Sequence, residues 1–385
     1  MRIALTNPYC WPEVRRGSER FLHELGCRFT DLGYDVTTVS THRGPYLRTK
    51  TDEGTIVRLP QKFSRSRFPR MWGPPHAFAL QCKEFLSRET FDIVHCMSYY
   101  DAYGAARAKR NGASFKLIMH HVGIPVKRYF RSIPHDYIMF RYAMRHADEL
   151  AVVSTFAAEK LSTEFGYSGH ITRPFVDLDI FTPKTDPGDA PPTILFVGDA
   201  DEVRKGARCL ARAFSIVKAT CPDSKLRFSG HATGPRIAQL LREVPNEYHE
   251  SVEFLGVGDV GDLSDQYRAA SVTVLPAIWE PYGMVLAESL ACGTPVVGCD
   301  HAGISDVITN DAVGALFRSD SLHGEPDNPE GLAEALLKAL ALARDPGTIP
   351  RCTEHARSFA WSAQRPAFEA MYGDGPSEKA PANHG

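Results

Sequence analysis

One stretch of the chain, Val272 to Gly298, constrains the fold more than any other. It reads VTVLPAIWEPYGMVLAESLACGTPVVG. The apolar run at its start is short and rich in β-branched residues, which is typical of a buried parallel strand. From Met284 the apolar residues recur at helical spacing up to Gly293, a residue type that favours a helix C-terminus. Thr294 to Gly298 is predicted as the next strand, so the stretch indicates a strand–loop–helix–strand unit of an α/β fold.

The loop between this strand and this helix suits a polar ligand. The first N–H groups of a helix have no partners within it, and the helix dipole makes that end slightly positive. Gly283 lets a ligand approach the backbone there. Glu280 lies before the helix and Glu288 lies about two turns into it, so their carboxylates can accept hydrogen bonds from both ends of one elongated polyol. The alternative is a surface helix with two solvated glutamates.

The run from Glu280-Pro281-Tyr282-Gly283 to Glu288, with the Gly-Thr-Pro-Val-Val exit, resembles the Glu-x7-Glu signature of retaining nucleotide-sugar glycosyltransferases. It is most similar to family 4, which has the GT-B fold. The resemblance implies that Glu280 holds hydroxyls of the donor sugar and Glu288 holds the ribose. It also implies that the backbone at Gly283, Met284 and Val285 contacts the sugar and the diphosphate.

The length of 385 residues is too great for one ordinary core, so two domains are expected. A proline-rich segment of low apolar content, TPKTDPGDAPP, is predicted as the linker between them. The resemblance implies two facing Rossmann-like α/β domains and a C-terminal helix that crosses back to the first. The predicted parts are an acceptor-side domain (1–181), the linker (182–192), a nucleotide-sugar domain (193–358), the crossover helix (359–372) and a disordered tail (373–385).

Charge and cysteine content exclude several classes of protein. A net charge of −2 gives no general attraction to nucleic acid. The nine cysteines are scattered without a C-x-x-C pair, which argues against a disulfide framework or a zinc site and for a reducing cytoplasm. The N-terminus has no signal-peptide pattern, and no apolar run approaches ~18 residues. A cytoplasmic protein is therefore expected.

The first domain opens with a predicted strand, a loop and an amphipathic helix from Glu19 to Leu32. In the resembled family this loop carries two adjacent glycines. Here Arg16 replaces the first, while Gly17 keeps the close approach of the backbone to the donor phosphate. Arg16 either places a cation near that phosphate or narrows the site. The alternative for both residues is a basic surface loop.

Residues 61–73, QKFSRSRFPRMWG, interleave four basic residues with aromatic and apolar ones. Such a segment can rest on an anionic membrane surface as a peripheral contact. It can also bind an anionic acceptor, or pack its aromatic rings onto its own domain. No recognised nucleic-acid-binding module surrounds it, so no nucleic-acid partner is expected.

A predicted strand from Phe115 to Met119 ends in His120-His121. The carboxyl ends of parallel strands face the crevice where α/β folds bind ligands. In the resembled family a histidine here, usually followed by Asp or Gly, contacts the donor sugar near its reacting face. His120 matches best because His121 occupies the Asp/Gly position. His121 remains an alternative, either histidine can be structural, and His95 has a weaker claim.

The second domain begins with a predicted strand from Thr193 to Val197. The resembled family places an Arg and then a Lys-Gly pair after it, and the two cations grip the diphosphate. Lys205, followed by glycine, matches the pair, but Asp199 replaces the Arg, so Arg204 is expected to supply the second charge. Asp199-Ala200-Asp201 matches the Asp-x-Asp of metal-dependent enzymes of another fold. It is interpreted as coincidence, so neither a metal nor a cofactor is expected.

Together these features predict a metal-independent, retaining glycosyltransferase. The donor would be a UDP- or GDP-sugar whose base lies at Gly256, and the acceptor would offer a hydroxyl from a glycan, a lipid-linked glycan or a small metabolite such as an aminocyclitol. Lys205, Glu280 and His120 would stabilise charge and orient the sugar, with no side-chain nucleophile. The rivals are a nucleotide-sugar epimerase and a catalytically silent nucleotide-sugar-binding protein. A Rossmann oxidoreductase is the least favoured rival, because no G-x-G-x-x-G follows the first strand of either domain.

Overall fold

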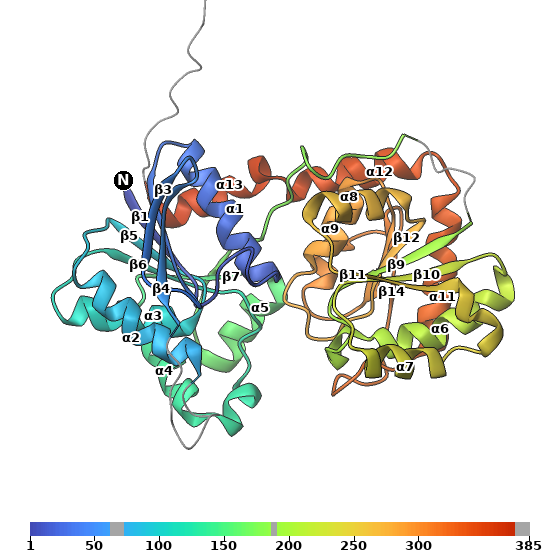
Figure 1. The fold of residues 1–385 in the computed structure, drawn as a ribbon, viewed down its shortest axis with the longest axis horizontal. Coiled ribbons are helices and arrows are strands. Elements are labelled where there is room, and N and C mark those ends of the chain that lie inside the picture. Colours follow the sequence, from blue (N-terminus) through green and yellow to red (C-terminus); the bar gives the residue numbers. More distant parts are fainter. Residues whose placement is uncertain (62–72, 186–190, 374–385) are drawn as a thin grey trace, which may run out of the picture. The chain divides into compact units, whose positions relative to one another are not determined.

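The computed structural model describes residues 1–61, 73–185 and 191–373, which form two compact α/β units. Unit 1 comprises Met1–Val153, Ala157–Thr172 and the chain from Arg365; unit 2 comprises Ser154–Phe156 and Arg173–Gln364. Each unit has a parallel sheet between helices (Figure 1). Most of the predicted membrane-contact segment, part of the predicted linker and nearly all of the predicted tail lie outside the described residues. The domain boundaries predicted from the sequence stay a prediction.

In the described residues unit 1 contains an eight-stranded sheet in the order β3-β4-β2-β1-β5-β6-β7-β8. Only β3 runs antiparallel, in a hairpin with β4. Its residues are all exposed, as suits an edge strand, whereas β5 and most of β6 are buried. The strands are β1 (Arg2–Thr6), β2 (Asp35–His42), β3 (Leu47–Thr51), β4 (Gly54–Pro60), β5 (Ile93–Cys96), β6 (Lys116–His121), β7 (Glu149–Val152) and β8 (His170–Ile171).

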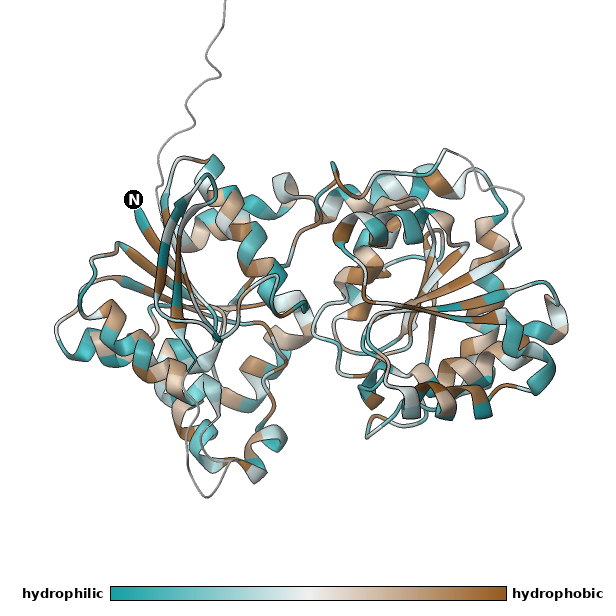
Figure 2. Ribbon diagram, viewed as in Figure 1, coloured by the Kyte–Doolittle hydropathy of each residue, from teal (hydrophilic) through white to brown (hydrophobic). Residues whose placement is uncertain are grey.

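The helices of unit 1 connect these strands and cover the sheet. Their apolar faces pack inward, and Figure 2 shows teal, hydrophilic residues on the outer sides of helices around brown strands. They are α1 (Gly17–Asp31), α2 (Pro74–Leu86), α3 (Tyr99–Arg110), α4 (Pro134–His146) and the longer part of α5 (Thr155–Lys160), with a 3₁₀ turn at Lys127–Ser132 and a π turn at Leu161–Phe165.

The last helix, α13 (Trp361–Tyr372), begins in unit 2 and ends in unit 1. In unit 1 the Phe368 ring lies 6.1 Å from Phe21 and 6.4 Å from Phe29, both on α1, and the Tyr372 ring lies 4.8 Å from Phe29. Figure 1 shows the red α13 beside the blue α1. The predicted C-terminal helix that crosses back to the first domain is confirmed.

Unit 2 contains, among the described residues, a six-stranded parallel sheet in the order β11-β10-β9-β12-β13-β14. The chain builds outward from β9 on one side and then returns to β12 on the other. The point between β9 and β12 is therefore a topological switch point, where α/β sheets bind ligands. The strands are β9 (Thr193–Val197), β10 (Lys225–Ser229), β11 (Val252–Gly256), β12 (Val272–Leu275), β13 (Val296–Cys299) and β14 (Gly314–Phe317).

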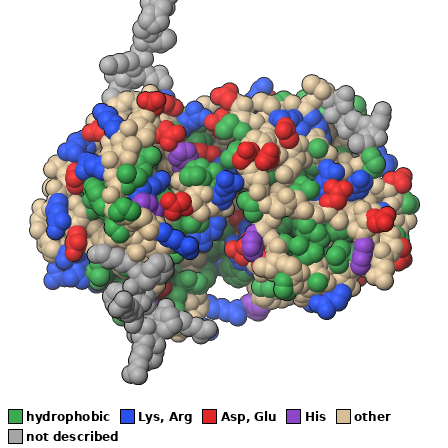
Figure 3. Space-filling model, viewed as in Figure 1, with side chains coloured by type: hydrophobic (Ala, Val, Ile, Leu, Met, Phe, Trp, Pro, Cys, Tyr) green, Lys and Arg blue, Asp and Glu red, His purple; other side chains and the backbone are tan. Residues whose placement is uncertain are grey.

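Strands β9 and β12 are buried along their whole length, which fits their unbroken apolar sequences and a sheet covered on both faces. The helices of unit 2 are α6 (Ala207–Thr220), α7 (Gly234–Arg242), α8 (Val260–Ala269), α9 (Met284–Ala291), α10 (Ile304–Val307), α11 (Pro329–Ala343), α12 (Thr348–Ala356) and the start of α13, with 3₁₀ turns at Val203–Lys205, Asn246–Ser251 and Arg357–Phe359. No helix in the described part of the chain combines the length and apolarity needed to cross a bilayer. Figure 3 shows acidic and basic side chains interspersed on the visible face.

The strand–loop–helix–strand unit predicted from the sequence is confirmed, with small shifts. β12 covers Val272–Leu275, α9 begins at Met284 and Gly293 has a φ of +75°, but β13 begins at Val296 rather than Thr294. Between β6 and β7, Pro134 starts α4 after the 3₁₀ turn Lys127–Ser132. Strands β3 and β14 and helices α2, α6, α7, α8 and α12 are among the elements that were not predicted from the sequence.

Candidate functional site

Two neighbouring cations follow β9 at the switch point of unit 2. Arg204 and Lys205 lie in a 3₁₀ turn that ends at Gly206, which has a φ of +76°. A Cβ atom on Gly206 would lie 2.9 Å from the carbonyl oxygen of Pro276 and 2.5 Å from Pro326. The glycine therefore lets the turn pack directly against the end of β12. This packing brings the predicted Lys-Gly pair to the loop that carries Glu280.

Glu280 receives both cations. Its Oε2 atom lies 2.6 Å from Lys205 Nζ and 3.2 Å from Arg204 NH1. The Glu280 and Lys205 side chains are only 13% and 16% exposed, against 37% for Arg204, which also pairs with Glu202 at 2.8 Å. Burial opposes ionisation of Glu280, but Lys205 and Arg204 outweigh it and hold the pKa of this carboxyl below its usual range. The site is therefore a charged cluster of one carboxylate and two cations.

The loop that presents Glu280 is held in an unusual conformation. Trp279 has a φ of +55°, and its indole N–H donates to the Leu322 carbonyl oxygen at 2.7 Å. The Gly303 N–H donates to the Glu280 carbonyl oxygen at 2.9 Å, and a Cβ on Gly303 would lie 2.1 Å from the Pro281 oxygen. Only glycine allows this approach. The turn after β13 thus supports the loop that carries Glu280.

The amino end of α9 lies next to this cluster in the chain. Gly283 has a φ of +101° and precedes the first helical residue, Met284. Leu286 N–H donates back to the Gly283 carbonyl oxygen. The N–H groups of Met284 and Val285 have no backbone acceptor among the described residues. Met284 and Val285 are partly exposed. Two backbone donors at a positive helix end are suited to an anionic ligand.

Glu288 has a different environment from Glu280. It is 1% exposed, and its Oε2 accepts a hydrogen bond of 2.8 Å from the Tyr267 hydroxyl. The alternative of two solvated surface glutamates is therefore wrong for both residues. The role of Glu288 toward a ribose stays a prediction, as does that of Gly256, which ends β11 in an exposed position with a φ of +72°.

Asp199 and Asp201 turn away from the cations and toward His231. His231 Nδ1 lies 3.4 Å from Asp199 and 3.0 Å from Asp201, and Asp201 also accepts from the N–H and hydroxyl of Thr233 at the start of α7. Asp201 thus holds Thr233, the residue that precedes the first turn of α7. The carboxylates and the imidazole are close enough for a metal ion to bind all three, although they are largely exposed.

His120 is fully buried in unit 1. His95 Nε2 lies 3.2 Å from His120 Nδ1, and Thr172 Oγ1 lies 3.3 Å from His120 Nε2. Burial, together with the neighbouring His95 and His121, holds the pKa of His120 well below its usual range. Both ring nitrogens of His120 have partners within unit 1, and its contact with a donor sugar stays a prediction.

His121 points to the other face of the same strand. Its ring packs edge-on against Phe140 at 5.2 Å and lies 6.4 Å from Tyr99. It is partly exposed, and burial lowers its pKa to about 4. The two histidine rings therefore lie in different surroundings, because successive side chains of a strand alternate between the two faces of the sheet.

Arg16 and Gly17 lie at the start of α1, where Gly17 is the first helical residue. Both are exposed. The Arg16 guanidinium lies 5.1 Å from the ring centroid of Tyr9 and 3.4 Å from a Glu19 carboxylate oxygen. This salt bridge and the Tyr9 ring orient the guanidinium, and the predicted contact of these two residues with a donor phosphate stays a prediction.

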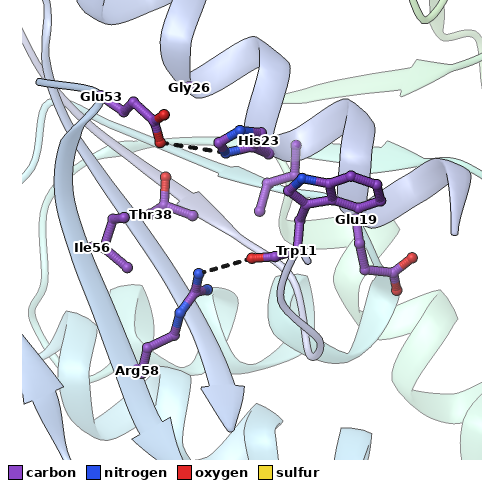
Figure 4. Close-up of a pocket in the computed structure, with 9 residues that line it drawn as sticks. Trp11, Glu19, His23, Gly26, Thr38, Glu53, Ile56 and Arg58 are labelled. Carbon is purple, nitrogen blue, oxygen red and sulfur yellow. Dashed lines mark hydrogen bonds and ion pairs between the residues drawn. The ribbon is translucent and has the colours of Figure 1, made fainter. Parts of the chain in front are cut away.

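A shallow pocket lies between α1 and the strands β2 and β4 of unit 1 (Figure 4). Its wall includes His23 and Glu53, which lie 3.7 Å apart, and these two form a further potential metal-ligand group with Cys27. Burial and the nearby Glu53 raise the pKa of the Cys27 thiol to about 11. The pocket is lined by Trp11, Glu19, Leu22, His23, Gly26, Thr38, Glu53, Ile56 and Arg58.

Sequence analysis missed a buried polar cluster around Asp136, where helices α2, α3 and α4 begin. The Asp136 carboxylate accepts from His76 Nε2 at 2.7 Å, Tyr99 at 2.9 Å and Tyr100 at 2.7 Å. The Gly73 N–H donates to His76 Nδ1 at 3.2 Å, so Nε2 carries the proton and is turned to Asp136 rather than to a metal. Tyr99 and Tyr100 are adjacent in the sequence, and this aromatic pair is the signal that could have drawn attention to the cluster.

Comparison with known proteins agrees with this geometry. Residues 191–341 match the family model described as glycosyl transferases group 1, and residues 15–180 match glycosyltransferase family 4. The chain is 30% identical to the D-inositol 3-phosphate glycosyltransferase of Kribbella flavida, over 92% of this chain and 90% of that protein. It is 26% identical to a phosphatidyl-myo-inositol mannosyltransferase of Propionibacterium freudenreichii, over 97% and 94%.

Solved structures support the fold. A sucrose-phosphate synthase from Thermosynechococcus elongatus superposes with a TM-score of 0.78 at 20% identity, over 96% of this chain and 98% of that one. The Anabaena protein HepE in complex with UDP-glucose gives a TM-score of 0.70 at 14% identity, over 96% and 99%. With two Rossmann-like units, the motif residues brought together in unit 2 and relatives along nearly the whole length, the chain belongs to glycosyltransferase family 4 and has the GT-B fold.

Proposed function

We propose that this glycosyltransferase transfers a sugar with retention of configuration and without a metal ion, and that it holds the donor diphosphate in unit 2. The observation that carries the proposal is the cluster of Lys205, Arg204 and Glu280 beside the amino end of α9. It offers two cations and free backbone N–H groups for a diphosphate, and a carboxylate for sugar hydroxyls.

The chemistry needs stabilisation of charge more than a nucleophile. Breaking the bond to the anomeric carbon leaves negative charge on the diphosphate oxygen and positive charge on the sugar ring. Lys205 and Arg204 would stabilise the leaving diphosphate, and Glu280 would orient the sugar. His120 would contact the sugar from unit 1, and the leaving phosphate would take the proton of the acceptor hydroxyl.

The acceptor that we propose carries an inositol phosphate group. The two relatives reported above are named for D-inositol 3-phosphate and phosphatidyl-myo-inositol, and they match along nearly their whole lengths. These names share a phosphorylated cyclitol and differ in whether a lipid is attached. We also place the protein in a reducing compartment, because all nine cysteines are free thiols.

The test is a turnover assay on the purified protein with UDP- and GDP-sugars. Each donor is offered alone, with inositol phosphate, and with phosphatidylinositol vesicles, and the release of nucleoside diphosphate is measured with and without a metal chelator. NMR of the product gives the anomeric configuration. We expect release that depends on an inositol acceptor, survives the chelator and yields the configuration of the donor.

Three results would contradict parts of the proposal. An inverted product would exclude retention, and loss of turnover with the chelator would exclude metal independence. Conversion of the donor sugar without any acceptor would identify an epimerase instead.

A further inference from the structure

Three hydrogen bonds join four side chains inside unit 1, beginning on its last helix. The Tyr372 hydroxyl lies 2.5 Å from His95 Nδ1, and His95 Nε2 lies 3.2 Å from His120 Nδ1. His120 Nε2 lies 3.3 Å from Thr172 Oγ1. The two histidines and Thr172 are fully buried, and Tyr372 is 6% exposed. These hydrogen bonds connect α13 to the carboxyl ends of β5 and β6 and to the residue after β8.

Both imidazoles in this row of hydrogen bonds, those of His95 and His120, are neutral. Burial lowers the pKa of His95 to about 3 and holds that of His120 well below its usual range. A neutral imidazole carries one N–H donor and one acceptor nitrogen. Each ring must therefore donate on one side and accept on the other, so the three hydrogen bonds share one direction.

The two hydroxyls at the ends fix that direction. The Tyr372 phenol is more acidic than the aliphatic hydroxyl of Thr172, so the phenol is the better donor and the Thr172 oxygen the better acceptor. The Tyr372 hydroxyl therefore donates to His95 Nδ1, and His95 Nε2 donates to His120 Nδ1. His120 Nε2 then carries the hydrogen that Thr172 Oγ1 accepts.

Aromatic packing holds the participating rings in place. The His95 and His120 rings stack with centroids 5.3 Å apart, and Phe21 meets His120 edge-on at 5.5 Å. Phe29 packs against Tyr372 at 4.8 Å. A 180° flip of either imidazole ring would disturb its packing against α1 and α13. What distinguishes the possible states is therefore which ring nitrogen carries the hydrogen.

We propose that Tyr372 is a positioning residue for the transfer reaction, because it fixes His120, through His95, as a donor at Nε2. The inference rests on the proposed function, in which His120 contacts the donor sugar. The bond from His120 to Thr172 is the longest of the three, so its Nε2–H is the group that can change partner. A sugar hydroxyl that replaces the Thr172 hydroxyl there meets a hydrogen-bond donor and must accept with its oxygen.

The direct test is two-bond ¹H–¹⁵N correlation NMR of the histidine side chains in the full-length protein. His95 and His120 are assigned from spectra of the His95→Gln and His120→Ala variants. We expect both to be Nε2–H tautomers in the wild-type protein. An Nδ1–H tautomer at either residue would overturn the proposed direction, and this result needs no Tyr372 variant to fold.

The functional test is a double-mutant cycle on turnover with the donor and acceptor identified above. Tyr372→Phe should lower kcat/KM for the donor about 10-fold, as loss of a supporting hydrogen bond does, and should give His120 mixed tautomers. In a His120→Ala background the same substitution should have no further effect, because Tyr372 acts through His120. An equal loss in both backgrounds would show a merely structural role and overturn the proposal.

The matched control is Tyr142→Phe on α4. Its hydroxyl is also buried and has no hydrogen-bond partner within the described residues, so kcat/KM and the His120 tautomer should stay at wild-type values. If His120→Ala itself keeps wild-type turnover, the assignment of His120 to the donor fails. The tautomers measured by NMR are independent of that outcome, so the two failures are distinguishable.

Discussion

The two units share the order of six parallel strands, β4-β2-β1-β5-β6-β7 in unit 1 and β11-β10-β9-β12-β13-β14 in unit 2, but they use the carboxyl edge of the sheet in opposite ways. In unit 2, Arg204, Lys205 and Glu280 lie in loops after the central strands β9 and β12 and are partly exposed. In unit 1, His95 lies near the carboxyl end of β5, the counterpart of β12, and His120 lies near that of the next strand, β6; both are fully buried. Unit 2 thus presents charge to a ligand, while unit 1 satisfies its polar groups internally. This difference supports our proposal that the donor diphosphate binds in unit 2.

The substitution with the largest expected effect is Glu280→Gln. It removes the charge that both cations share and weakens the hydrogen bonds offered to sugar hydroxyls, so kcat should fall about 100-fold to 1,000-fold. Steady-state turnover with a competent donor and acceptor measures it. The control is Glu253→Gln, which removes a carboxylate that pairs with Lys225 and Arg227 on the far strands of the same sheet. A comparable loss in both variants would contradict the assignment.

Replacing the two cations one at a time should sharpen the assignment within unit 2. Lys205→Ala should lower kcat/KM for the donor about 100-fold and Arg204→Ala about 10-fold. Lys205 is the more buried of the two and makes the shorter contact with Glu280, while Arg204 is shared with Glu202. Initial-rate kinetics at varied donor concentration give both values. The reverse order would assign the main diphosphate contact to Arg204.

The backbone of unit 2 that supports these cations can be tested by stability. Gly206→Ala adds a methyl group where a Cβ would lie 2.5 Å from Pro326, at a φ of +76°. We expect a loss of about 2–4 kcal/mol in the free energy of unfolding. Gly324→Ala has a similar φ of +77° but open space around it, so about 1 kcal/mol is expected from the backbone alone.

Denaturant unfolding of the two glycine variants gives these free energies. Equal losses at Gly206 and Gly324 would show that the close approach to Pro326 and Pro276 has no energetic consequence.

The smallest expected effect is a difference in the acid sensitivity of the two units. The pKa values of His95, His120 and His121 are lowered in the folded chain, so the unfolded chain binds more protons as the pH falls below about 6.5. Unit 1 should lose stability over that range. Burial raises the pKa of the Asp101 carboxyl to about 7. This single group binds its proton more tightly in the folded chain, so it partly offsets the loss of stability. Glu280, with a lowered pKa, loses its contribution only as the pH falls through the lowered value.

Hydrogen exchange at about pH 7 and about pH 5, corrected for intrinsic rates, measures the difference. Protection of β5 and β6 should fall more than that of β9 and β12. In Asp101→Asn the opposing group is absent, so the fall in unit 1 should become steeper. Equal changes in both units would contradict the account of the buried histidines.

The sequence was most informative where a site is built from neighbouring residues. The run from Val272 to Gly298 carries its strand, its turn glycine and its helix within one segment, and each is where the pattern predicts it. The contact of Lys205 with Glu280 could not be read locally, because 75 residues separate the two and the strand order brings them together. The family resemblance assigned Lys205 to the diphosphate and Glu280 to the donor sugar, but it did not predict their contact.

Burial of the histidines in unit 1 was beyond the sequence for a different reason. A histidine at a strand end is equally compatible with a ligand contact and with an internal hydrogen bond. Which of the two applies to His120 depends on the side chains of β5 and α13 that lie near its ring. These are His95 and Tyr372, which are 25 and 252 residues away from His120 in the sequence. The hairpin strand β3 was not predicted, because all of its side chains are exposed. Its sequence therefore lacks the alternation of apolar and polar residues that marks a strand with one buried face.

The most direct test of the central claim is the calorimetric Kd of a nucleoside diphosphate for the wild-type protein and two variants. UDP and GDP are titrated first, and the one that binds is used throughout. We predict that Lys205→Ala in unit 2 weakens binding about 100-fold, while Arg16→Ala at the start of α1 in unit 1 changes the Kd less than about 5-fold. Unchanged affinity in Lys205→Ala, or a larger loss in Arg16→Ala, would contradict the assignment of the diphosphate to unit 2.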